Sequence, residues 1–274
     1  MKTRQAIALG VFFLGALISM AGAQPVLPDN SRQPAEAYYA SGEAFDSGRN
    51  GESDPQRALE CYLAAASLGH AESMNRVGML YAEGRGVPQE YTVAFAWYES
   101  AALNGSAPAL RNIATMYFYG LGVPQDYKQA AKVLQVAIRD GNADAQNKLA
   151  TLYDAGLGVP QDAALAFELF QDAARQGYPP ALANLGRMYI TGTSVKRDDV
   201  RGYALIQAAV DAGVPSSMQS AVRLALREAG GRLDTSELSR AQNLTKKLKA
   251  AFRPAGDAVD QGHDIRLATG PVAD

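Results

Sequence analysis

The stretch YAEGRGVPQE, residues 81–90, decides how this chain of 274 residues is organised. It returns as YFYGLGVPQD at 117–126 and YDAGLGVPQD at 153–162, and in altered form as YITGTSVKRD at 189–198, always 36 residues further on. A glycine-rich loop between helices can hold a phosphate, but this one lacks the Lys-Ser/Thr pair of a phosphate-binding loop. Copies at one fixed interval therefore indicate a structural turn that is used once per repeat.

Each repeat predicts two helices. Met74, Val77, Gly78 and Tyr81 recur every three or four residues, which is the spacing of one helical face. A second apolar stripe of the same period follows each loop, and no segment shows the alternation of a strand. The register divides the chain into five repeats, numbered 1 to 5 below: 35–70, 71–106, 107–142, 143–178 and 179–214.

Small residues and glycines mark the helix contacts and helix ends. One first-helix position is always small, which lets two helices cross closely; it holds Gly42, Gly78, Ala114, Ala150 and Gly186. A glycine that can adopt the left-handed conformation also stands where the second helix of each repeat is expected to end; these are Gly69, Gly105, Gly141, Gly177 and Gly213. Asp54 is expected to cap a second helix; its equivalents are Glu90, Asp126, Asp162 and Asp198.

The C-terminal part continues the helical pattern and then loses it. Residues 215–252 predict two capping helices, the second started by Thr235 or Ser236, and terminal solenoid units need such a polar outer surface. Residues 253–274 predict a flexible tail. The expected fold is an all-α, right-handed α-α superhelical solenoid of about five 36-residue repeats with a C-terminal capping helix pair.

The N-terminus has the pattern of a secretory signal peptide. Lys2 and Arg4 precede an apolar run, and Ala21-Gly22-Ala23 fits the cleavage pattern. The sequence predicts a signal peptide at 1–23, cleavage near Ala23-Gln24, a linker at 24–34 and a periplasmic or secreted product without a stable membrane span. An uncleaved membrane anchor is the alternative.

Composition argues against several classes of site. The net charge of −2 comes without a basic cluster, so no nucleic-acid partner is expected. Cys61 is the only cysteine and falls in an apolar column, whereas His70 and His263 are expected to be ordinary surface residues. The stretch DSGRNGESD (46–54) lacks the acid that a calcium loop needs at its twelfth position. We expect no metal, no cofactor and no catalytic residue.

The fixed register, the Gly-x-Gly-Val-Pro loop and the stretch AFAWYESAALNG (94–105) resemble the Sel1-like repeat family, which is related to tetratricopeptide repeats. In that architecture the first helices line a concave groove, which the resemblance implies is the binding surface for a protein or an extended peptide. Positions 5, 9 and 12 of each repeat are expected to face this groove. The expected groove residues are Tyr39, Asn75, Arg111, Thr115, Phe118, Asn147, Asp154, Arg187 and Arg223.

The resemblance implies an exported, non-catalytic, monomeric scaffold or regulator of cell-envelope processes. A periplasmic domain of a sensor kinase or an envelope complex is the kind of partner that similar proteins bind. A cell-wall hydrolase or penicillin-binding activity is one alternative, although the relatives linked to it carry paired cysteines that this chain lacks. An assembly factor for a surface or polysaccharide machine is the other.

Overall fold

The computed structural model describes residues 34–49 and 51–251, and in these residues it contains helices and turns but no strand. The predicted signal peptide, the linker up to residue 33 and the tail at 253–274 lie outside the described residues. The helices are α2 (Pro34–Ser47), α3 (Pro55–Ser67), α4 (Ala71–Glu83), α5 (Tyr91–Leu103), α6 (Ala107–Tyr119), α7 (Tyr127–Ala137), the 3₁₀ turn η2 (Ile138–Asp140), α8 (Ala143–Ala155), α9 (Ala163–Arg175), α10 (Pro179–Thr191), α11 (Asp199–Ala212), α12 (Ser216–Gly230) and α13 (Thr235–Ala251).

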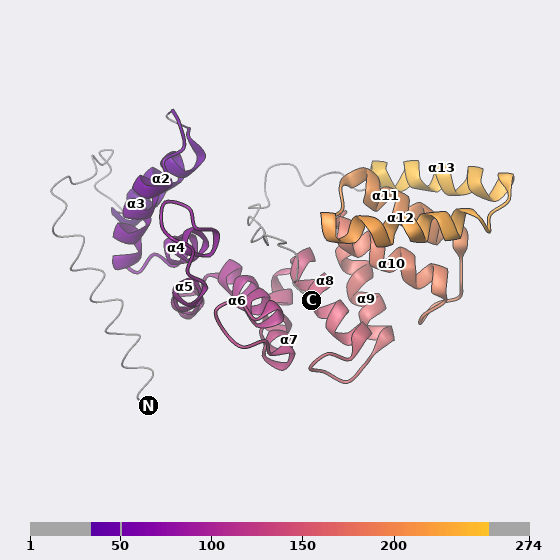
Figure 1. The fold of residues 1–274 in the computed structure, drawn as a ribbon, viewed down its shortest axis with the longest axis horizontal. Helices are drawn as coiled ribbons and strands as arrows, with labels where there is room; N and C mark the ends of the chain where they lie inside the picture. Colours follow the sequence, from indigo (N-terminus) through magenta and orange to yellow (C-terminus); the bar gives the residue numbers. More distant parts are fainter. Residues whose placement is uncertain (1–33, 50, 252–274) are drawn as a thin grey trace, which may run out of the picture. The chain divides into compact units, whose positions relative to one another are not determined.

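The helices form two compact units, and the boundary between them in the sequence falls between Gln125 and Asp126. In the N-terminal unit α2 packs on α3 and α4 on α5, and the pairs stack in chain order up to α6 (Figure 1). In the C-terminal unit α8 packs on α9 and α10 on α11, followed by α12 and α13. The all-α repeat fold expected from the 36-residue register is confirmed in both units.

The repeated loop ends each first helix through its first glycine. Gly84, Gly120, Gly156 and Gly192 are left-handed, with φ between 66° and 74°, and each donates its N–H to a carbonyl of the helix. A side chain at this φ would meet the following carbonyl, which is why glycine is favoured. The prediction that the loop is a structural turn is confirmed.

Four of the five expected second-helix caps form. The side chains of Asp54, Asp126, Asp162 and Asp198 accept a backbone N–H of the first helical turn. Glu90 occupies the same position but makes no side-chain cap hydrogen bond, so that expectation is wrong. Glutamate has one methylene more than aspartate, and short side chains are the ones that reach the N–H groups of their own first turn.

In repeats 2, 3 and 4 the second glycine of the loop lies directly against the backbone of the preceding repeat. A Cβ on Gly122 would lie 2.4 Å from the backbone carbon of Tyr91, and one on Gly158 would lie 2.4 Å from that of Tyr127. These backbone atoms belong to the first residue of the preceding repeat's second helix. The loop therefore rests directly on that helix end, and only glycine permits this distance.

The small first-helix position has the expected packing role. A Cβ on Gly78 would lie 2.6 Å from the Tyr98 ring, and one on Gly186 would lie 2.6 Å from the Ile206 side chain. In both cases the opposing residue belongs to the second helix of the same repeat. The missing side chain therefore gives the space into which the large one inserts.

The capping helices α12 and α13 both pack on α11 (Figure 1). The cap of α13 is Asp234, which accepts the N–H of Glu237 at 2.8 Å, while the Glu237 carboxylate accepts the N–H of Asp234 at 3.1 Å. The expected caps Thr235 and Ser236 are therefore wrong by one or two residues. This reciprocal arrangement is a capping box, which satisfies two backbone donors at once.

Candidate partner-binding surface

The first helices of consecutive repeats are joined by pairs of asparagine side chains. In the N-terminal unit Asn112 donates to the amide oxygen of Asn75 at 2.9 Å, and in the C-terminal unit Asn184 donates to that of Asn147 at 3.1 Å. Asn75 is 1 % exposed and Asn147 is 9 % exposed. The expectation that these two amides face an open groove is wrong, because each is used to connect neighbouring helices.

A second set of contacts joins the last residue of a repeat to the second residue of the same repeat. His70 lies 3.3 Å from the Glu36 carboxylate, Ser106 donates to Glu72 at 3.1 Å, and the Tyr178 hydroxyl donates to Asp144 at 2.8 Å. Sequence reasoning missed this set. An acid at position 2 together with a polar residue at position 36 is a signal that the register could have revealed.

Tyr39 belongs to a cluster of polar side chains on α2 and α4. Its hydroxyl donates to Glu43 at 3.0 Å, and Glu43 lies 3.6 Å from the guanidinium of Arg76. Burial is the main cause that raises the pKa of Tyr39 to about 12. The hydroxyl therefore stays protonated at neutral pH and acts as a donor within the protein.

Of the groove residues predicted in the C-terminal unit, two form an ion pair with each other and one is exposed. Arg187 on α10 and Asp154 on α8 form an ion pair at 2.5 Å, and the Arg187 side chain is 43 % exposed. Arg223 on α12 is exposed. Arg187 and Asp154 therefore act as a pair that connects α10 to α8, and the pair remains partly accessible to solvent.

The accessible part of the N-terminal strip lies on α6. Arg111, Thr115 and Phe118 are spaced by four and three residues and so share one helical stripe. Within residues 34–49 and 51–251, the Arg111 guanidinium forms no hydrogen bond or ion pair. Phe118 contacts the ring of Tyr119 at a centroid distance of 4.9 Å, and Tyr119 is 46 % exposed. We call these four residues the α6 face; Tyr119 was not among the predicted residues.

A model of the Sel1 repeat matches residues 35–70, 71–106, 107–142, 143–178 and 179–214, which are the five repeats derived above. These matches cover more than half of the chain. The chain belongs to the Sel1 repeat family. Sel1 repeats build solenoids that are typical of protein–protein interaction scaffolds, and the family is generally non-catalytic.

Solved Sel1 repeat structures resemble this one. A protective antigen of uropathogenic Escherichia coli that displays an SLR fold is 26 % identical, with a TM-score of 0.73 over 85 % of this chain. The present chain spans 51 % of that antigen's length. A Sel1 repeat protein from Oxalobacter formigenes shares the fold at 24 % identity, with a TM-score of 0.66 over 80 % of this chain and 90 % of its own. No curated protein sequence gives a significant match.

Two single residues of these Sel1 repeats were interpreted from sequence. Cys61 is 1 % exposed, as its apolar column predicts, and burial raises the pKa of its thiol. His70 is not an ordinary surface residue: its Nδ1 accepts the N–H of Ser73 at 3.1 Å and so caps α4. His263, which was also expected to be an ordinary surface residue, lies outside the described residues. A histidine can replace the usual short polar cap because its δ nitrogen reaches the same N–H.

No group of three or more histidine, cysteine or acidic side chains gathers in a way that could hold a metal ion, within residues 34–49 and 51–251. No helix in the same ranges is long and apolar enough to cross a membrane.

Proposed function

We propose that this chain is an exported, non-catalytic binding protein that contacts another protein or an extended peptide through its first helices. The observation that carries the proposal is the α6 face, where the half-buried ring of Phe118 and the exposed ring of Tyr119 share a stripe with Arg111. Among residues 34–49 and 51–251 the Arg111 guanidinium has no hydrogen-bond or ion-pair partner. Arginine and aromatic side chains contribute most of the binding energy in protein interfaces. Membership of the Sel1 repeat family supports the same role.

The proposal also includes other predicted residues, considered separately in each unit. The ion pair of Asp154 and Arg187, together with Arg223, would contribute polar contacts from the C-terminal unit. Tyr39 would contribute its partly exposed ring from α2. Asn75 and Asn147 are left out because their amides are buried and bonded.

The proposed location is the periplasm or the extracellular space, and the proposed partner is a component of the cell envelope such as the periplasmic domain of a sensor kinase. The proposed export is supported by residues 1–23, which begin with two basic residues, continue with an apolar run and end with small residues that fit a cleavage site. A protein that binds its partner without catalysing a reaction would act as a scaffold or as a regulator of cell-envelope processes.

The test is site-specific photocrosslinking in cells of the source organism. A photoreactive phenylalanine analogue replaces Phe118 in one protein and Leu103 in another; Leu103 lies on α5 of the same unit and is 88 % exposed. We expect a discrete crosslinked species from position 118 that disappears with Arg111→Ala, and none from position 103. Equal crosslinking from both positions, or none from 118, would contradict the proposal.

A further inference from the structure

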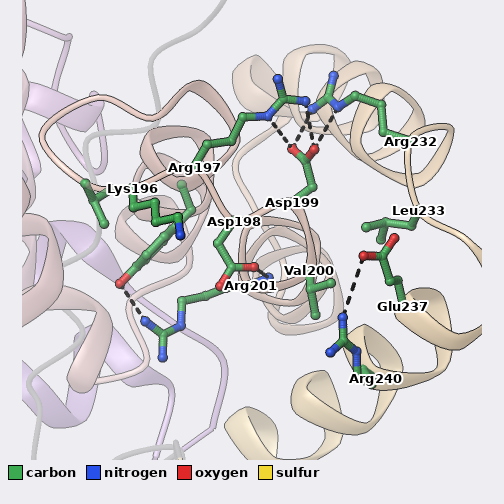
Figure 2. A pocket seen from close by; sticks show the side chains of 12 residues that line it. Lys196, Arg197, Asp198, Asp199, Val200, Arg201, Arg232, Leu233, Glu237 and Arg240 are labelled. Carbon is green, nitrogen blue, oxygen red and sulfur yellow. Dashed lines mark hydrogen bonds and ion pairs between the residues drawn. The ribbon is translucent and has the colours of Figure 1, made fainter.

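A cavity of about 520 Å³ lies in the C-terminal unit. It is formed by the loop between α10 and α11, the start of α11, and the turn between α12 and α13 (Figure 2). Its volume falls within the range of about 300–1,000 Å³ that ligand pockets have. We call it the cationic pocket, because five of its lining side chains are basic: Lys196, Arg197, Arg201, Arg232 and Arg240.

One edge of the cationic pocket is a closed ionic triad. Asp199 accepts from Arg197 at 2.8 Å and from Arg232 at 2.8 Å and 3.0 Å. The hydrogen bond from Arg232 is the main cause that lowers the pKa of Asp199. Figure 2 shows the two guanidinium groups meeting over this single carboxylate. Two positive charges therefore share one negative charge along this edge.

The remaining cations are less compensated. Arg201 lies over the Tyr189 ring and donates to its hydroxyl at 3.0 Å, which holds the guanidinium in place without neutralising it. Lys196 is exposed and forms no hydrogen bond or ion pair with any of the described residues. Arg240 approaches Glu237 only at 3.7 Å. The two remaining acids of the lining are Asp198 and Glu237, so cations exceed acids in the pocket by five to three.

The repeat framework does not require these cations. Repeats 2, 3 and 4 carry Pro-Gln where repeat 5 carries Lys196 and Arg197. In those repeats the glutamine amide donates to a carbonyl of its own first helix; the donors are Gln89, Gln125 and Gln161, at 2.7, 2.9 and 2.8 Å. Arg197 instead extends to Asp199. The loop of repeat 5 therefore lacks the glutamine hydrogen bond that stabilises the turn in repeats 2 to 4, and it carries two charged side chains that line a cavity.

We propose that the cationic pocket binds a short acidic segment of a partner protein, through carboxylates that contact Lys196 and Arg201. Guanidinium groups form strong, directional hydrogen bonds with carboxylates. The three acids of the lining limit the net excess of positive charge to two, which suits one or two carboxylates better than a multiply charged phosphate group. The proposal extends the protein-binding role, but it uses residues that are separate from the α6 face and is tested without the natural partner.

The test measures binding of a labelled peptide, Gly-Glu-Asp-Glu-Gly, to the purified chain by fluorescence anisotropy. Its amide analogue, Gly-Gln-Asn-Gln-Gly, is the ligand control. We expect the amide analogue and the K196A/R201A variant each to raise Kd by at least about tenfold, because each removes two or more charged contacts. K196A alone changes an exposed side chain that forms no hydrogen bond or ion pair within the described residues, so the variant should fold normally and raise Kd about threefold.

The protein control is K128A/K132A, which removes two exposed lysines from α7 of the same unit and so causes the same change in net charge. Its Kd should stay within about twofold of the wild-type value. Equal loss of binding in this control, unchanged binding by K196A/R201A, or equal affinity for the amide analogue would overturn the proposal. Displacement of the peptide by inorganic phosphate at a lower concentration than by free glutamate would overturn the choice of carboxylate. Failure of the photocrosslinking at Phe118 would leave this result unaffected.

Discussion

The loop of repeat 4 (156–162) and the loop of repeat 5 (192–198) join equivalent helices, and both begin with a left-handed glycine. They differ in the next turn. Gly158 has φ 69° and its Cα faces the backbone of α7, whereas Ser194 has φ 59° and carries a side chain. The same backbone turn therefore serves packing in repeat 4, whereas in repeat 5 it presents Lys196 and Arg197 to the cationic pocket.

The largest effect is expected at the second glycine of a packed loop. Gly122→Ser should lower the free energy of unfolding by about 3 kcal/mol, because it adds a side chain in the left-handed region and a Cβ that would lie 2.4 Å from backbone. Urea unfolding followed by circular dichroism measures it. The matched change Ser194→Gly should raise stability by about 1 kcal/mol. If the two changes in the free energy of unfolding were equal in size and opposite in sign, the backbone φ alone would explain them, and the close packing at Gly122 would contribute nothing.

A smaller effect is expected for the glutamine that closes the packed loop. Gln125→Ala should cost about 0.5–1 kcal/mol, since it removes the hydrogen bond to the Phe118 carbonyl. Arg197→Ala should change stability by less than about 0.5 kcal/mol, since the pair is exposed and Asp199 keeps Arg232. Urea midpoints of the two variants measure the difference. A larger loss for Arg197→Ala would contradict the division of roles between the loops.

The smallest effect is a pH dependence at Asp199. Its pKa is lowered in the folded protein, so its ionised form contributes stability that is present above the unfolded pKa of about 3.9 and is lost as the pH falls through the folded pKa. The stability difference between wild type and Asp199→Asn should be constant from about pH 5 to 8 and shrink below about pH 4. Urea midpoints across this range measure it. A difference that persists at low pH would show that the carboxylate acts through shape instead of charge.

The repeat register was predictable from sequence because each packing contact recurs at one interval. Gly84 and Gly86 indicate the turn. The small residue Gly78 indicates that a large residue of the second helix packs against it where the two helices cross. Exposure on the first helices was less predictable. Asn75 has the same helical position as Arg111, yet it is buried, because the amide of Asn112 on the next repeat bonds to it.

The cationic pocket was not predicted, because it depends on two turns that are distant in sequence. Lys196 follows α10, whereas Arg232 and Arg240 belong to the capping helices and the turn before α13. The capping helices lie outside the 36-residue register, so the register gives no information about which repeat residue they face. The substitution of Pro-Gln by Lys-Arg in repeat 5 was visible in the sequence, but only the structure shows what surrounds it.

The most direct test of this account replaces the loop of repeat 5 with that of repeat 4, by T193L, S194G, K196P and R197Q in one protein. We claim that residues kept in register build the fold and that the departures in repeat 5 serve binding. The urea midpoint should therefore stay at or above the wild-type value, while Kd for the peptide Gly-Glu-Asp-Glu-Gly rises at least about tenfold. Unchanged affinity, or a lower urea midpoint, would contradict the claim.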